Sequence, residues 1–258
     1  MGLTIHYSLK ATGSEARARQ FVQALHQCAQ DLPFQELGPV KQFSGTEGDA
    51  DHRNDPLRWF LIQAETSVEI KPKGRKQTPD YTQWQRVRPL RGIGFTAWPG
   101  EGCEQSNFGL CQYPAVVQTI NGPLRTKLSG WRWGSFCKTQ YSSDPRCGGL
   151  PHFLQCHLTV IALLDKAKEL GCLDEVHDEG GFWSQRNMQD LVRQIGSWNE
   201  MIAAFGGVMK DLVGEGIEMP ISEFPDFEKL EAAGQAKLPP EIAQLAKLVQ
   251  RVARSPGT

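Results

Sequence analysis

The spacing of the hydrophobic residues changes once along this chain, near residue 148. Before that point, apolar and polar residues alternate over short runs, as they do in half-buried strands. After Gly148 and Gly149 the apolar residues recur at the spacing of one helix face. The change predicts an α+β fold, in which a strand-rich part (1–147) packs against a helical part (148–258) as a single compact domain.

The chain begins with a predicted β-α-β-β order. Residues 3–9 alternate like a strand, Ser14 is a candidate helix N-cap, and apolar residues recur at helical spacing until Pro33. Residues 36–43 and 57–62 then return to strand character. A helix packed on one face of a mixed or antiparallel sheet would bury this pattern.

Further strands are expected in the aromatic-rich stretch that follows, where glycine and proline mark the turns. In the last of them, Trp131, Trp133, Ser135 and Cys137 share one face, because side chains alternate along a strand. The expected strands cover residues 93–97, 107–112, 116–120 and 131–139.

The helical part is expected to contain a central helix that ends at Gly171. Residues 153–164 are apolar almost all round, which is typical of a helix buried on every side. A second helix begins near Ser184 and is either kinked or broken at Gly196. A third covers residues 239–254, and residues 173–183 are expected to form a loop.

Composition excludes several classes of protein. Lys and Arg number 28 against 29 Asp and Glu, which argues against a globally basic nucleic-acid-binding protein. The start lacks the pattern of a secretory signal and no run is long enough to span a membrane. The seven cysteines are odd in number and contain no Cys-x-x-Cys pair, so reduced thiols in a cytoplasmic protein are expected.

One segment is strongly basic. Residues 71–91 contain seven Lys and Arg against the single acidic residue Asp80, a local charge of 7 − 1 = +6, and Tyr81 and Trp84 lie among them. Such a mixture can stack bases and contact phosphates, which gives one function hypothesis: a non-catalytic interaction protein that binds nucleic acid or an acidic partner. The alternative is a solvated hairpin or loop.

No sequence motif fixes a reaction or a cofactor, and no cofactor is predicted. Polar residues instead gather in three clusters within the aromatic and glycine-rich sequence. In the first, Glu101 and Glu104 lie on a turn, where they would bind a cation, act as acid and base, or remain solvated. In the second, Lys138 is a candidate anion contact, Tyr141 a candidate proton donor and Cys137 either a nucleophile or a core cysteine.

The third cluster joins a helix to the loop that follows it. His157 lies on the apolar side of its helix and needs a hydrogen-bond partner, for which Asp178 and Glu179 are candidates. Such a pair is either an oriented general base or a core histidine that ties the helix to the loop. Trp183 and Arg186 lie nearby as candidate ligand contacts.

We therefore expect a pocket where the sheet meets the helices, which binds, and in one reading acts on, a small polar or anionic molecule. The candidate residues are His157, Glu179, Asp178 and Tyr141 for catalysis, and Lys138, Arg186 and Trp183 for binding. A metal site is not predicted. His152 and Cys156 have suitable spacing, but Cys147 or His177 would have to complete the ligand set.

Overall fold

A computed structural model describes residues 3–44, 63–70, 83–213, 230 and 232. Its centre is a seven-stranded sheet with the order β11-β1-β10-β7-β6-β2, in which β3 also pairs with β6. All the strand pairings are antiparallel, which confirms the predicted α+β class. The strands are β1 (Thr4–Ala11), β2 (Glu36–Leu37), β3 (Lys41–Ser44), β6 (Arg91–Trp98), β7 (Ser106–Gln112), β10 (Trp131–Lys138) and β11 (Leu173–Asp178).

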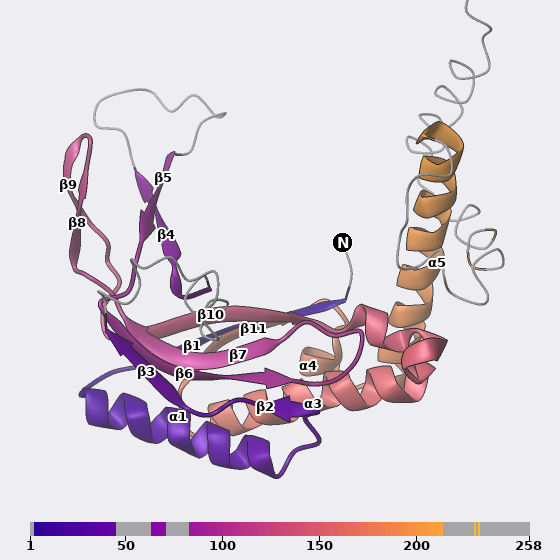
Figure 1. Ribbon diagram of the computed structural model, residues 1–258, viewed down its shortest axis with the longest axis horizontal. Helices are drawn as coiled ribbons and strands as arrows, with labels where there is room; N and C mark the ends of the chain where they lie inside the picture. Colours follow the sequence, from indigo (N-terminus) through magenta and orange to yellow (C-terminus); the bar gives the residue numbers. More distant parts are fainter. Residues whose placement is uncertain (1–2, 45–62, 71–82, 214–229, 231, 233–258) are drawn as a thin grey trace, which may run out of the picture.

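Two helices cover one face of this sheet, α1 (Glu15–Gln30) and α3 (Gly149–Glu169) (Figure 1). The Ser14 side chain caps α1 by accepting a hydrogen bond from the Arg17 amide, as the sequence predicts. Beneath the helices, aromatic side chains of neighbouring strands stack. The ring of Phe108 lies 4.9 Å from that of Tyr7 and 5.7 Å from that of Phe95, measured between centroids. These rings form the centre of the core.

The two faces of β10 differ in the way that the sequence predicts. Trp131, Trp133, Ser135 and Cys137 are buried, whereas Gly134 and Phe136 are exposed on the opposite side. We call that side the open face, because α1 and α3 both lie on the other one (Figure 1). Any ligand that binds the sheet without disturbing the core has to approach from the open face.

Two hairpins project from one end of the sheet, away from α1 and α3 (Figure 1). One pairs β4 (Thr66–Ile70) with β5 (Gln83–Val87), and the other pairs β8 (Val116–Thr119) with β9 (Gly122–Arg125). The second hairpin turns at Gly122, whose φ of +99° suits glycine. At the other end of the sheet, α5 rises on the same side as the hairpins.

The segment after α3 differs from the prediction. Residues 173–183 were expected to form a loop, but residues 173–178 form the edge strand β11 on β1. Alternation was hard to see because Asp174 and Glu175 are adjacent, and charged side chains are common on edge strands since one side meets water. The prediction of a loop was therefore wrong for residues 173–178.

The helices that follow are α4 (Phe182–Gln185) and α5 (Met188–Val213). α5 runs through Gly196 as one helix, so the break that the sequence left open does not occur. Short turns of 3₁₀ helix connect β10 to α3, η3 (Gln140–Ser143) and η4 (Pro145–Cys147). Among the described residues, no helix combines the length and apolar character needed to cross a membrane. The predicted elements at 57–62 and 239–254 lie outside the described residues.

Candidate functional site

Thr139, His157 and Asp178 meet beneath the edge of the sheet. His157 and Asp178 belong to the third predicted cluster, and Thr139 directly follows β10. Nε2 of His157 lies 3.4 Å from the carboxylate of Asp178, and Nδ1 lies 3.0 Å from the Thr139 hydroxyl. The side chains of His157 and Asp178 are 0% and 1% exposed. We call Thr139, His157 and Asp178 the sealed cluster. Both ring nitrogens have partners, so this histidine ties α3 to β11.

The Asp178 carboxylate has further donors that hold it in place. The amides of Gly180 and Trp183 each donate to it at 2.8 Å. Burial raises the pKa of Asp178, but the hydrogen bonds from His157, Trp183 and Gly180 outweigh it and hold the pKa below its usual range. A Cβ at Gly180 would lie 2.6 Å from the Leu191 side chain and 3.1 Å from the Asp178 carboxylate, so the backbone packs closely on the pair.

The other predicted site residues have separate partners. Glu179 accepts from the backbone amide of Thr4 at 2.9 Å. Arg186 forms a bidentate ion pair with Asp165, at 2.7 and 2.8 Å, and stacks on Trp183 with its guanidinium carbon 4.6 Å from the ring centroid. The ammonium of Lys138 lies over the Tyr141 ring at 4.6 Å. The structure brings together His157 and Asp178, while these other side chains make local contacts of their own.

A second polar group lies between β7 and β10. The Gln63 side-chain oxygen accepts two hydrogen bonds, from the Asn107 amide at 2.7 Å and from the Ser135 hydroxyl at 2.8 Å. Gln63 itself is anchored through its neighbour, because the Tyr113 hydroxyl donates to the carbonyl of the fully buried Ala64. We call Gln63, Asn107 and Ser135 the open-face network; Ser135 belongs to the buried face of β10, but it lines the same hollow as Gly134 and Phe136 of the open face.

The network exists because β7 and β10 separate. Their backbone ladder pairs Trp131 with Gln112 and Arg132 with Cys111. Further along, the Asn107 carbonyl instead accepts from two side chains, the Tyr7 hydroxyl at 2.8 Å and the Trp133 indole at 2.7 Å. Burial raises the pKa of Tyr7 well above its usual value, so the phenol stays a neutral donor.

One acceptor of the network has no partner. Asn107 is 1% exposed, and its Oδ1 has no hydrogen bond within the part of the chain that the structure describes. Leaving such a buried acceptor unmatched costs about 1–3 kcal/mol. An unmatched group of this kind calls for a specific reason, and one such reason is a ligand that supplies the missing donor.

A cavity adjoins Asn107. Its volume is about 620 Å³, which is the range of small-molecule sites. It is bounded by the open-face network, by Gly134 and Phe136 of β10, and by three polar residues: Glu65, Glu104 and Gln105. A smaller hollow of about 240 Å³ shares Gln63, Glu65 and Gly134 with it, so the two adjoin at Gly134.

The charged side chains that line the larger cavity are acidic, among the described residues. Glu65 and Glu104 line it, and no Lys or Arg does so among the described residues. Glu104 also accepts from the Lys138 backbone amide at 3.3 Å, which fixes its position beside β10. The lining therefore suits a ligand that donates hydrogen bonds more than one that carries negative charge.

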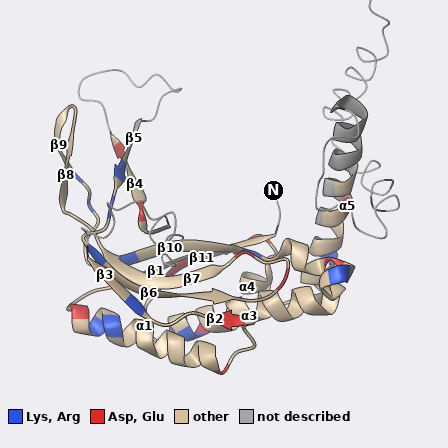
Figure 2. Ribbon diagram, viewed as in Figure 1, with Lys and Arg blue, Asp and Glu red and all other residues tan. Residues whose placement is uncertain are grey.

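The described arginines of the basic segment face carboxylates. Arg88 lies 2.9 Å and Arg86 3.9 Å from Glu65, and Arg91 lies 2.7 Å from Glu15. Figure 2 shows the basic and acidic positions side by side on the β4–β5 hairpin. Residues 71–82 lie outside the described part, so binding of nucleic acid or an acidic partner through 71–91 stays a prediction.

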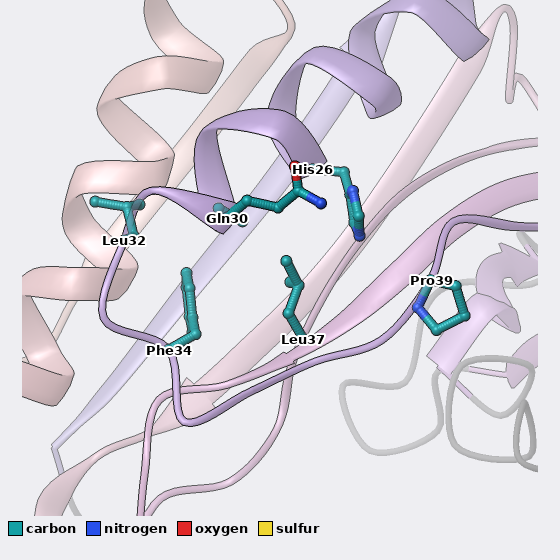
Figure 3. Close-up of a pocket in the computed structure, with 7 residues that line it drawn as sticks. His26, Gln30, Leu32, Phe34, Leu37 and Pro39 are labelled. Atoms are coloured by element: carbon teal, nitrogen blue, oxygen red, sulfur yellow. The ribbon is translucent and has the colours of Figure 1, made fainter.

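A further hollow lies between α1 and β2 (Figure 3). Its volume is about 480 Å³, and the residues around it come from one stretch of the chain, 26–39. The only titratable side chain on its lining is His26, whose Nε2 already lies 2.9 Å from the Gly38 carbonyl oxygen. Figure 3 shows apolar Leu32, Phe34 and Leu37 around the rest, so this hollow offers few groups for recognition.

The possible metal ligands do not form a site. Cys156 and His152 lie together, with Sγ 3.5 Å from Nε2. No group of three or more His, Cys, Asp or Glu side chains in the described ranges is arranged to hold a metal ion. His177, one of the two residues considered as a third ligand, instead lies across β1 from them, paired with His6 in the sheet register.

The residues of the cavity were only partly predicted from the sequence. Glu104 belongs to the first predicted cluster and Ser135 was assigned to a face of its strand, but Gln63 and Asn107 were not singled out. The signal for Asn107 was available, since an amide side chain at the start of an apolar strand must find partners if it is buried. Gln63 carried no such signal, because its place above β10 follows from tertiary packing.

Comparison of the chain with protein-family models, with curated proteins and with solved structures finds no match. The geometry of the site is therefore the whole basis for a functional proposal.

Proposed function

We propose that this protein binds a small, neutral or cationic molecule rich in N–H or O–H donors in the cavity between β7 and β10. The observation that carries the proposal is the unpartnered, buried Oδ1 of Asn107, a residue that lines a cavity of ligand size. A donor from the ligand would remove the free-energy cost of this unmatched acceptor, so the site would favour molecules that donate hydrogen bonds.

The rest of the lining supports the same class of ligand. Glu65 and Glu104 add carboxylate acceptors at the rim, and Phe136, which is 40% exposed, offers an apolar surface for the body of the molecule. This combination of an apolar wall and a few polar groups is typical of small-molecule sites. An anionic ligand, which the sequence also suggested, would meet two carboxylates and no cation among the described lining residues.

The proposal is one of binding, without a reaction. The side chains of the open-face network are amides and a hydroxyl, and Tyr7 and Trp133 act as neutral donors to a backbone oxygen. None of these groups is a general base at neutral pH, and the two carboxylates of the lining have partners of their own, Arg88 for Glu65 and the Lys138 amide for Glu104. The sealed cluster contains an imidazole and a carboxylate, but both are buried away from the cavity lining.

The test uses a panel of defined probes on the intact chain. Adenosine, cytidine, glucosamine and spermidine represent donor-rich neutral and cationic molecules, and glucose 6-phosphate and citrate represent anions. A probe present at 100 times its dissociation constant should stabilise the protein by about 2.7 kcal/mol, measured as a thermal shift. We expect stabilisation by at least one donor-rich probe and by neither anion.

A steric variant connects the shift to the cavity. A Cβ at Gly134 would meet no atom within 4 Å, and its φ is not positive, so Gly134→Val fits the strand and fills the border of the two hollows. Gly196→Ala is the matched control, because it also adds atoms to open space, but on α5. Gly134→Val should abolish the shift and Gly196→Ala should retain it. Equal shifts in both variants, or stabilisation by anions alone, would refute the proposal.

A further inference from the structure

Outside the cavity, a group of sulfur atoms lies where the β6–β7 loop packs on α3. The loop that carries Cys103 packs against Cys156, since a Cβ at Gly100 would lie 3.1 Å from Cys156 Sγ, although 53 residues (156 − 103) separate the two cysteines in the sequence. Cys103 belongs to the loop and Cys156 to the second turn of α3. Sequence analysis considered Cys156 as a metal ligand and did not connect it with Cys103.

The loop is shaped to make this contact. Its turn is closed by a hydrogen bond from the Cys103 amide to the Gly100 carbonyl at 3.1 Å, and the Trp98 indole donates to the Cys103 carbonyl at 3.0 Å. Gly100 has a φ of +154°, and a Cβ there would lie 3.1 Å from Cys156 Sγ. The absence of a side chain at Gly100 lets the loop backbone approach the sulfur closely.

The two sulfurs have different surroundings. Cys103 is partly exposed, whereas Cys156 is fully buried and lies 3.5 Å from both the Pro99 carbonyl oxygen and His152 Nε2. Hydrogen bonds from Cys103 and, more weakly, Ser142 lower the pKa of Cys156 despite its burial, and the pKa of Cys103 is raised correspondingly. Within the pair, the pKa of the inner thiol is therefore the lower of the two.

We propose that Cys103 and Cys156 are a redox-active pair that forms a reversible disulfide when the protein meets a peroxide. This differs from a structural disulfide, because both thiols are free in the structure. It is also independent of the proposed ligand, since neither cysteine lines the cavity.

The two cysteines would take different roles because they differ in exposure. The sulfur of Cys103, the less buried residue of the pair, attacks one oxygen of hydrogen peroxide; the O–O bond breaks, the departing oxygen takes up the thiol proton, and a sulfenic acid and one water form. Cys156 then attacks the sulfenic sulfur, the S–S bond forms and a second water leaves. Two thiols lose two electrons and two protons, and one peroxide becomes two waters.

The experiment maps the bond in the full wild-type chain. The protein is treated with one equivalent of hydrogen peroxide, its remaining thiols are alkylated under denaturing conditions, and the tryptic peptides are examined by mass spectrometry. We expect the seven alkylatable thiols to fall to five, with one cross-linked peptide pair joining Cys103 to Cys156. Dithiothreitol should restore all seven.

Two variants separate this pair from its neighbours. Cys103→Ser changes a partly exposed loop residue and should abolish the cross-link. Cys147→Ser, at another partly exposed cysteine close to Cys156, should leave it intact. A chain that keeps all seven thiols after peroxide, or a bond from Cys156 to Cys147 or Cys137 in the wild type, would overturn the proposal.

Discussion

The sealed cluster and the open-face network are both buried polar groups attached to β10 or its end, yet their hydrogen bonding differs. In the sealed cluster, both nitrogens of His157 have partners and Asp178 accepts from two backbone amides as well. In the open-face network, Asn107 keeps an acceptor without a donor beside a cavity of about 620 Å³. Complete hydrogen bonding indicates a structural role, whereas an unmatched group beside a cavity indicates binding.

In this protein the chemically reactive residue types have structural roles, and residue types without such reactivity line the candidate site. A histidine beside a carboxylate has the chemistry of a general base, but its environment gives it the role of a connection between α3 and β11. An asparagine and a glutamine carry no such chemistry, but their environment leaves one of them incomplete.

The largest effect is expected from breaking the sealed cluster. Asp178→Ala leaves His157 and the amides of Gly180 and Trp183 without their acceptor, so the free energy of unfolding should fall by about 3 kcal/mol. Chemical denaturation measures the change. Asp165→Ala removes only the exposed ion pair with Arg186 and should cost less than about 1 kcal/mol. Similar small losses in both variants would mean that the sealed cluster does not stabilise the fold.

The same cluster should make stability depend on pH. The folded pKa of Asp178 is lowered, so its contribution is fully present above the unfolded pKa, near 4, and is lost as the pH falls through the folded value. Denaturation midpoints between pH 6 and pH 2 should therefore decrease, and Asp178→Asn should flatten the acidic part of that decrease. A variant with an unchanged pH profile would exclude Asp178 as a source of acid sensitivity.

Within the open-face network, a smaller loss is expected. Ser135→Ala removes one of the two donors to Gln63 while the other, from Asn107, remains, so the free energy of unfolding should fall by about 1 kcal/mol. Thermal and chemical denaturation both measure it. Ser142→Ala is not a suitable control because Ser142 lies beside the cysteine pair; Ser129→Ala, outside both groups, should change stability by less than about 0.5 kcal/mol. A loss above that of Asp178→Ala would reverse the comparison.

The smallest effect is expected at the rim of the cavity. Glu104→Gln keeps an oxygen that can accept from the Lys138 amide but removes a negative charge, so the affinity for spermidine should fall by about two- to fivefold. Glu101→Gln, three residues earlier on the same loop and outside the lining, should leave the affinity unchanged. Titration calorimetry at low salt measures both. An equal loss in the two variants would indicate a general charge effect in place of a contact in the cavity.

Much of the fold follows from local sequence patterns. The alternation in β10, the Ser14 cap of α1 and the apolar surface of α3 are short-range signals, and the structure confirms them. The edge strand β11 was missed because its adjacent acidic residues hide the alternation that burial on one side would produce. Asp178 was one of the two partners predicted for His157, since a histidine on an apolar helix face must find an acceptor, whereas Thr139 was not predicted.

The cavity could not be predicted in the same way. It depends on the separation of β7 and β10 beyond Arg132, on the Tyr7 and Trp133 donors that replace the missing ladder, and on the approach of Gln63 from a distant segment. These are tertiary relationships between residues far apart in the chain. Local patterns predict which residues are buried, but not where two strands part.

The central claim is that ligand binds at the open-face network and leaves the sealed cluster untouched. The most direct test is a titration of ¹⁵N-labelled protein, followed by NMR, with the donor-rich probe that gives the largest thermal shift. The account predicts that the side-chain amide signals of Gln63 and Asn107 and the backbone amide of Ser135 shift in a saturable way, while those of Gly180 and Trp183 do not. Saturable shifts confined to Gly180, Trp183 and the ring of His157 would contradict it.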